Sequence, residues 1–252
     1  MPPTRLQHVW NQVAPLAGGI ALALLIRAMV VETFYVPSGS MLPTLLIGDH
    51  VFVSKFSYGA RLPFTNIHLP ALRDPERGEV VVFDLGKRGS VICPLDRCPG
   101  YPHESFVKRV MGLPGDVIEL RRGQVYLNDA PLTLSWRGES FEDAHGRVLR
   151  WGHETLDGVE HSLLDHPESS GLPQSRIRVP EDHYFMMGDN RDFSNDSRGW
   201  GLVPRNDIRG PALRIYWSWN NSYSWPEMAN PLNWLRLLWG ETHWSRFGDK
   251  VQ

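Results

Sequence analysis

The sequence predicts a mainly β protein, with an N-terminal transmembrane helix followed by an antiparallel β body that carries a smaller inserted β region. An apolar run without charges near the N-terminus predicts the helix. Beyond residue 34, short alternating or apolar runs are separated by Gly, Pro and Asp, which is typical of strands joined by tight turns. This part of the sequence has no long helical periodicity. We therefore divide the chain into an anchor segment, residues 1–32, and a β-rich domain, residues 33–252.

The composition is that of an ordinary folded protein and excludes few functions. The 252 residues are 42% hydrophobic and 21% charged, and the formal net charge of -2 gives no indication of a nucleic acid partner. Basic residues are mostly arginine, and the chain has only four lysines: Lys55, Lys87, Lys108 and Lys250. If the function requires a lysine, only these four residues are candidates for it.

The two cysteines, Cys93 and Cys98, lie close together in the sequence. Two ligands are too few for a structural zinc site, which needs four. A local disulfide fits an oxidising compartment, and two free thiols fit the sequence equally well.

The N-terminal apolar run is long enough for a membrane anchor when it is counted across one arginine. Residues 13–26 carry no charge, and after Arg27 the apolar residues continue to Val31. A helix needs roughly 20 residues to cross the hydrocarbon layer, and a flanking arginine can extend its charged end to the interface. The alternatives are a buried core helix and a cleavable signal peptide. A signal peptide is disfavoured because only Arg5 and His8 supply a basic region and no small-residue cleavage site follows.

The body is divided into strands, an insertion and a tail. Residues 129–178 are more polar than the rest, and we interpret them as an inserted β region without a catalytic role. Residues 228–252 form a C-terminal tail, whose aromatic part at 231–239 predicts an amphipathic helix that lies on the membrane or packs on the body. The segments that most clearly predict strands are residues 50–54, 79–83, 117–120 and 124–127, with turns at 113–116 and 127–130.

Two serines lie in a restricted segment directly after the anchor. Ser38 and Ser40 belong to Pro-Ser-Gly-Ser-Met-Leu-Pro, which begins at Pro37 and has a proline at each end. A nucleophilic serine needs a rigid, exposed turn with nearby hydrogen-bond donors for the oxyanion. A linker that leaves a membrane helix has the same composition, so the segment alone leaves both interpretations open.

A lysine is the best candidate for the base that would activate such a serine. The sequence has no Gly-x-Ser-x-Gly motif, and its ten histidines are scattered without metal-binding spacing. Strand alternation places Phe106, Lys108 and Val110 on one apolar face, where burial would lower the pKa of the lysine. An ordinary amphipathic lysine is the alternative, and Lys55 is the rival candidate.

Residues 187–201 form a polar block rich in Asp, Asn, Arg and Ser. The block is a loop held by Asx turns and Asp–Arg pairs, or a scaffold that orients the base of an active site. A calcium loop is excluded because the EF-hand pattern starting at Asp192 would place Ser197 where Gly is needed and Val203 where Glu is needed. The sequence therefore predicts no metal and no cofactor.

Five blocks, in this order, resemble the bacterial type I signal peptidases, and the resemblance covers most of residues 20–215. The cysteine segment and the 129–178 insertion are outside the shared blocks. Some members of the family have two spanning segments, whereas this sequence predicts one. The blocks are residues 37–45, 48–59, 77–83, 107–116 and 188–191.

The resemblance implies a role for each matching residue. It makes Ser40 the nucleophile, Lys108 the general base, Ser38 an oxyanion donor beside the backbone N–H of Ser40, and Ser194 the serine that orients the lysine. The residues that would brace the site are Asp189, Arg191, Asp196 and Arg198. The residues that would line shallow apolar substrate pockets are Phe34, Val36, Met41, Leu45, Phe106 and Val107.

The resemblance also implies the activity and its location. The protein would be a monomeric, single-pass enzyme of the bacterial cytoplasmic membrane with its catalytic domain on the periplasmic face. It would remove signal peptides from exported preproteins, cleaving after small residues through an acyl-enzyme.

Two other classes of protein compete with this interpretation. One is another Ser–Lys peptidase, either a self-cleaving repressor or a conjugation-system maturase. The absence of a DNA-binding helical domain argues against the repressor. The other is an inactive, membrane-tethered β module that binds peptides, which would have no need of both Ser40 and Lys108.

Overall fold

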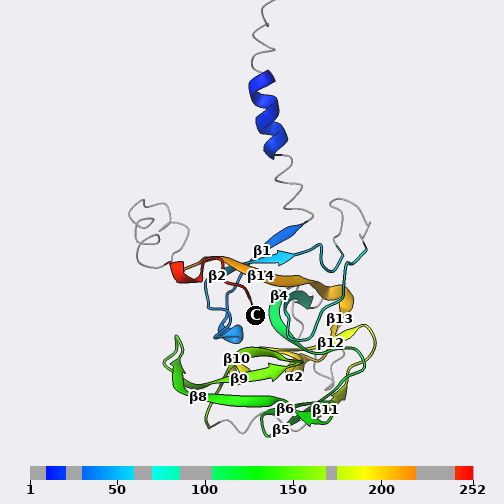
Figure 1. The fold of residues 1–252 in the computed structure, drawn as a ribbon, viewed down its shortest axis with the longest axis vertical. Coiled ribbons are helices and arrows are strands. Elements are labelled where there is room, and N and C mark those ends of the chain that lie inside the picture. The colour runs from blue at the N-terminus through cyan, green and yellow to red at the C-terminus, as the bar shows by residue number, and fades with distance from the viewer. Residues whose placement is uncertain are drawn as a thin grey trace, which may run out of the picture.

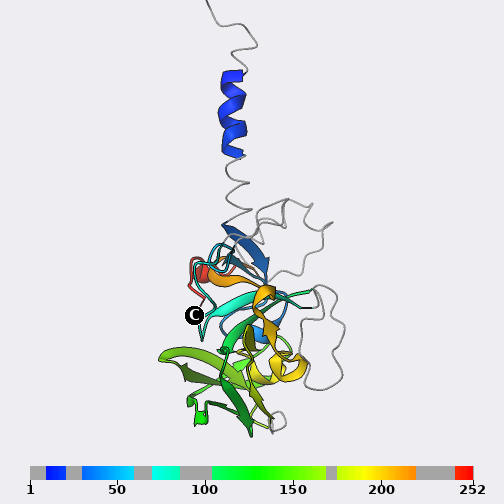
Figure 2. The ribbon, with the colours of Figure 1, turned by 90° about the vertical axis from the view of Figure 1, so that its right-hand side faces the viewer.

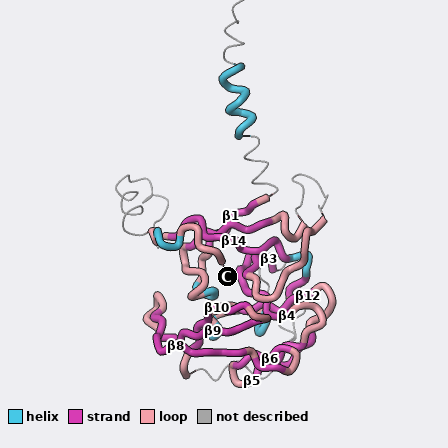
Figure 3. Tube along the Cα trace, in the orientation of Figure 1, coloured by secondary structure: helices cyan, strands magenta, loops and turns pink. Residues whose placement is uncertain are grey.

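The fold was analysed in a computed structural model, which describes residues 10–20, 30–59, 70–85, 104–168, 175–219 and 242–251. Strands dominate these residues, and the helical segments other than residues 10–20 are short (Figure 3). The predicted mainly β, antiparallel class is therefore confirmed. Cys93, Cys98, Lys87 and the helix predicted at residues 231–239 lie outside the described residues.

The main sheet within the described residues has seven strands, and every neighbouring pair is antiparallel. It includes two of the predicted strands, those at residues 50–54 and 79–83. In spatial order the strands are β1 (Val31–Tyr35), β2 (Asp49–Ser54), β14 (Ile208–Ser218), β3 (Val80–Leu85), β4 (Glu104–Gly112), β12 (His183–Met187) and β13 (Val203–Pro204) (Figure 1).

Strand β3 is buried on both faces, which explains its continuous apolar run. Val80 and Val82 face one core cluster, which also contains residues of β1 and β2. Val81 and Phe83 face a second cluster, which contains Trp200. The main sheet is thus the middle layer between two packed cores.

Two smaller sheets lie beside the main sheet (Figures 1 and 2). The first contains β8 (Thr133–Glu142), β9 (Val148–Leu156) and β10 (Val159–Asp165), all from the predicted insertion. The second contains β5 (Val117–Arg121), β6 (Gln124–Leu127), β7 (Ala130–Pro131) and β11 (Ser175–Arg178). The insertion therefore forms a sheet of its own and then returns to the body through β11, which pairs with β5.

The turn chemistry that the sequence predicts is present between the strands of the second small sheet. Asn128 and Asp129 have φ angles of 50° and 68°. A tight hairpin turn that matches the right-handed twist of its strands requires two successive residues in the left-handed conformation. Asn and Asp tolerate this conformation well. Gly115, in the predicted turn before β5, has a φ of 89°.

At the N-terminus, residues 10–20 are helical and most of their side chains are exposed. Trp10 and Leu16 are exposed by 69% and 66%, so this helix does not pack its apolar side chains against the body. Among the described residues, the structure contains no helix whose length and hydropathy would allow it to cross a bilayer. Residues 21–29 of the predicted anchor lie outside the described part of the chain.

The described end of the C-terminal tail packs on the body. Val251 contacts the core cluster of β1, β2 and β3. Arg246, in a short 3₁₀ turn (Trp244–Arg246), forms an ion pair of 2.7 Å with the buried Asp49 at the start of β2. These contacts fix residues 242–251 beside the segment that follows β1.

Candidate active site

Ser40 lies in a one-turn 3₁₀ helix, η1 (Gly39–Met41). Hydrogen bonds from Asn190 of the polar block hold the backbone of this turn. The backbone N–H of Asn190 donates to the carbonyl of Ser40 at 3.1 Å. The side-chain amide of Asn190 donates to the carbonyl of Gly39 at 3.0 Å. Buried Met41 and Leu45 anchor the other side of the turn. The serine hydroxyl is therefore presented by a backbone with little freedom to move.

Gly188 permits this close contact between two segments that are distant in the sequence. A Cβ at this position would lie 2.4 Å from the Ser40 carbonyl oxygen and 2.2 Å from Ser194 Oγ. Both distances are well below van der Waals contact, so any larger residue would separate the turn from the polar block. Gly188 is the first residue of the shared block at residues 188–191. The close contact with Ser40 explains why this position is a glycine.

Lys108 lies on β4 and reaches the Ser40 hydroxyl from the centre of the main sheet. Its side chain is only 3% exposed, and Nζ hydrogen-bonds to Ser40 Oγ. Its strand neighbours Phe106 and Val110 both belong to the core cluster around Trp200, which confirms that they share an apolar face. Of the two candidate lysines, Lys55 instead forms an ion pair with Glu32 at 3.4 Å.

Burial lowers the pKa of Lys108 to about 8. Desolvation is the largest cause, because the apolar surroundings disfavour the charged ammonium. The carboxylates of Asp196 and Asp189 oppose this change, and Arg198 adds to it. A substantial fraction of the amine is therefore neutral near pH 8 and able to accept a proton.

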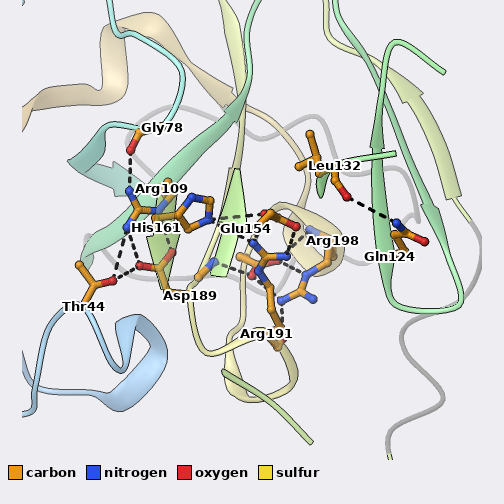
Figure 4. A network of polar contacts seen from close by, with 12 residues as sticks. Thr44, Gly78, Arg109, Gln124, Leu132, Glu154, His161, Asp189, Arg191 and Arg198 are labelled. Carbon is orange, nitrogen blue, oxygen red and sulfur yellow. Dashed lines mark hydrogen bonds and ion pairs between the residues drawn. The ribbon is translucent and has the colours of Figure 1, made fainter. Parts of the chain in front are cut away.

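The polar block and strand β4 are joined by a buried ion pair that the sequence analysis did not identify. Arg109 donates to Asp189 through Nε at 2.8 Å and Nη2 at 2.7 Å, and both side chains are inaccessible to solvent (Figure 4). Arg109 also donates to the carbonyl of Gly78, and the hydroxyl of Thr44 donates to Asp189. Burial would raise the pKa of Asp189, but Arg109 outweighs it and holds that pKa below its ordinary value.

A second buried ion pair shapes the block itself. Asp196 accepts from Arg198 Nε and Nη2, both at 2.7 Å, and from the backbone N–H of Gly188 at 3.0 Å. Asp196 also caps the short helix α2 (Ser197–Trp200) by accepting from the Arg198 backbone N–H. This carboxylate therefore fixes the glycine that contacts Ser40.

Arg191 pairs with a residue of the insertion rather than with its neighbours in the block. It forms a buried ion pair with Glu154 of β9, and His161 of β10 lies 3.4 Å from the same carboxylate (Figure 4). Burial would raise the pKa of Glu154, but Arg191 and His161 outweigh it and lower that pKa to about 2. No signal in the sequence connects Glu154 or His161 to residue 191, because the pairing depends on how the sheets stack.

The two remaining predicted serines lie close to the pair of Ser40 and Lys108. Ser38 is extended, and its Oγ is 3.5 Å from Ser40 Oγ. The hydroxyl of Ser194 is buried against Gly188 and makes no hydrogen bond to Lys108 among the described contacts. The roles of both serines remain predictions.

The residues predicted to bind substrate divide between two places. Five belong to one core cluster beside the turn of Ser40, and they are Phe34, Val36, Met41, Leu45 and Val107. Phe106 packs on the opposite side of the main sheet. It also lines a cleft of about 400 Å³ that contains Ser38, Ser40 and Lys108. In the described part of the chain, no cluster of three His, Cys, Asp or Glu side chains has an arrangement suited to a metal ion.

The chain was compared with protein families, curated proteins and solved structures. The family model described as "Signal peptidase, peptidase S26" matches residues 9–217. Signal peptidase I of Pseudomonas fluorescens is 38% identical over 234 residues, covering 86% of this chain and 74% of that protein. Signal peptidase I of Pseudomonas aeruginosa is 36% identical over 228 residues, with the same coverage. A solved signal peptidase I from Enterococcus faecalis aligns at 21% identity and a TM-score of 0.34, covering 56% of this chain and 98% of that one.

The family model and the Pseudomonas relatives define the class of protein as a serine peptidase, which is a hydrolase. Within that class, the chain belongs to the signal peptidase family, peptidase S26, as a type I member. The resemblance found in the sequence is confirmed.

Proposed function

We propose that this protein is a membrane-bound endopeptidase that removes signal peptides from exported preproteins, with Ser40 as nucleophile and Lys108 as general base. The observation that carries the proposal is the hydrogen bond between a buried, partly neutral lysine and a serine on a fixed turn. A hydroxyl needs a base to become nucleophilic, and in the described site Lys108 is the titratable group in contact with it.

The first half of the reaction forms a covalent intermediate. Neutral Lys108 accepts the proton of Ser40 Oγ while this oxygen attacks the carbonyl carbon of the bond to be cleaved. The tetrahedral intermediate collapses, the protonated lysine gives its proton to the leaving amine, and the signal peptide stays attached to Ser40 as an ester.

The second half releases the signal peptide. A water molecule takes the place of the departed amine, and Lys108 accepts a proton from it while the water oxygen attacks the ester carbonyl. The second tetrahedral intermediate collapses, the bond between the carbonyl carbon and Ser40 Oγ breaks, and the protonated lysine returns the proton to this oxygen. Burial of Lys108 supports both halves, because the amine must return to its neutral form in each cycle. Asp189, Arg191, Asp196 and Arg198 act in this proposal by holding the polar block against the turn of Ser40.

The negative oxygen of each intermediate needs donors, and we assign the backbone N–H of Ser40 and the hydroxyl of Ser38. The extended backbone of Ser38 places its Oγ 3.5 Å from Ser40 Oγ, which supports this assignment.

Replacing Ser38 with alanine should slow cleavage with little effect on folding. Loss of one oxyanion donor costs about 2.7–4 kcal/mol of transition-state stabilisation, or 10²–10³ in kcat. Single-turnover cleavage of a preprotein in detergent measures this directly. A Ser38→Ala protein that cleaves at the wild-type rate would show that Ser38 is not an oxyanion donor. Ser38→Thr should keep part of the activity because it retains a hydroxyl.

The titration of Lys108 should control the dependence of activity on pH. Because only the neutral amine accepts a proton, kcat/KM should rise about tenfold per pH unit below about pH 8 and level off above it. Cleavage rates between pH 6 and 10, with the unfolding midpoint recorded at each pH, test this. A profile that is flat across pH 8 in a folded protein would exclude Lys108 as the base.

An extended substrate could pair with the edge of β4 that faces β12, beside Lys108. β4 pairs with β3 along Glu104–Arg109, but β12 contacts the other edge of β4 only at Arg109, Val110 and Gly112. The register of β12 with β4 therefore ends at Arg109, one residue after Lys108. A signal peptide that added to this edge would present its small residues to the apolar residues around Val36 and Met41.

Membrane attachment follows from the kind of substrate. A signal peptide is held in the bilayer, so an enzyme that cleaves it gains from being anchored beside it. We propose that residues 1–32 supply the single anchor and that the β domain faces the periplasm as a monomer. The apolar residues of the helix at 10–20 are exposed, which supports a role outside the protein core.

A further inference from the structure

The cleft around Ser40 has a wall that belongs to the insertion. The turn between β8 and β9, residues 143–147, lines it through Asp143, Ala144, His145 and Arg147. The same cleft is lined by Ser40 and Lys108. A segment predicted to have no catalytic role thus borders the residues proposed to perform the reaction.

The turn is rigid, because one buried carboxylate organises it. Asp143 accepts from the backbone N–H groups of His145 and Arg147, both at 2.9 Å. Its other oxygen accepts from Arg147 Nε at 2.6 Å. The guanidinium of Arg147 lies over the ring of Phe193, 3.6 Å from the centroid, which connects the turn to the polar block.

An apolar cluster also fixes the hairpin to the turn that carries Ser40. Leu42, directly after η1, packs with Leu149 of β9 and Leu164 of β10. Phe141 and Phe193 pack against the same cluster. The position of residues 143–147 relative to Ser40 is therefore set by side-chain packing.

Of the six residues predicted to line the substrate pockets, Phe106 lines the cleft, whereas the other five belong to a cluster that shares no residue with the one on which the turn packs. Phe34, Val36, Met41, Leu45 and Val107 are not among its lining residues. A substrate bound across Ser40 has its signal peptide on one side of the cleaved bond and the mature chain on the other. The side bordered by the turn is the one left for the mature chain.

We propose that residues 143–147 form the binding site for the first three residues of the mature chain, and that His145 favours an acidic side chain there. This inference rests on the proposed function and adds a selectivity to it. His145 and Ala144 are exposed at the tip of the turn. The charge of Asp143 is matched by Arg147 and two backbone donors, which leaves the imidazole as the exposed polar side chain that the turn itself presents. An imidazole donates a hydrogen bond whether or not it is protonated, and a charged carboxylate oxygen accepts a stronger hydrogen bond than an amide oxygen.

The test uses preproteins that differ at one position after the cleaved bond. Asp is compared with Asn at each of the first three mature positions, as mixed substrates in one reaction, with the products counted by mass spectrometry. Wild-type protein should cleave the Asp form about threefold faster at one of these positions, the scale of one exposed hydrogen bond to a charged group. His145→Ala should bring it to about one, and His145→Asp should invert it.

A matched control separates local contact from overall charge. Arg178→Gln removes one positive charge on β11, outside the cleft, and should leave the Asp-to-Asn ratio unchanged. Equal cleavage of Asp and Asn forms by wild type, a wild-type ratio in His145→Asp, or an equal change in Arg178→Gln would each overturn the inference. Failure of the wild type to cleave any preprotein would overturn the proposed function instead, so the two failures are distinguishable.

Discussion

Replacing Ser40 with alanine is expected to reduce preprotein cleavage to background, a loss of about a millionfold, while the protein stays folded. Alanine has no oxygen to attack the carbonyl, and no other described hydroxyl bonds to Lys108. The turn should persist, because Asn190 holds it through backbone carbonyls that the substitution does not remove. Cleavage of a labelled preprotein and the unfolding midpoint are measured on the same sample.

Ser135→Ala is the matched control for this change. Ser135 lies exposed on β8 and does not line the cleft, so its loss should leave the cleavage rate unchanged. Residual turnover by a folded Ser40→Ala protein, beyond what contaminating peptidases explain, would mean that another residue is the nucleophile.

Replacing Lys108 with either alanine or arginine should lower the cleavage rate by about 10⁴-fold, the upper range for a general base. Alanine removes the base, and arginine stays protonated at any working pH and cannot accept the proton from Ser40. Combining Ser40→Ala with Lys108→Ala should be no worse than Ser40→Ala alone, because residues that act as a unit are not additive.

Lys55→Ala provides the control lysine. Lys55 is 28% exposed and pairs with Glu32, so its removal should cost at most about 1 kcal/mol of stability and leave cleavage unchanged. A Lys108→Arg protein that cleaves near the wild-type rate, or a Lys55→Ala protein that does not cleave, would contradict the assignment of the base.

The sequence was sufficient for features that depend on short-range patterns. Apolar alternation predicted β2, β3, β5 and β6, and it placed Phe106 and Val110 together on one face of β4, with Lys108 between them. The turn at Asn128 and Asp129 followed from residue preferences alone. These inferences hold because neighbours in a strand or turn fix each other's direction without reference to the rest of the fold.

The partners within the polar block could not be inferred in this way. Asp189 and Arg191 are close in sequence, yet one pairs with Arg109 of β4 and the other with Glu154 of β9. These choices depend on the order and stacking of the sheets, which no local pattern encodes. The same holds for the turn at residues 143–147. Its polar composition is that of any surface loop, and only the packing of the fold places it beside the cleft.

The central claim is most directly tested by the product that the purified full-length protein makes from an exported preprotein in detergent. The mass and N-terminal sequence of the new fragment identify the bond that was cleaved. The account predicts a single cleavage directly after a small residue at the end of the signal peptide, with a small residue two positions earlier. An intact preprotein after incubation with folded enzyme, or cleavage at unrelated bonds, would contradict it.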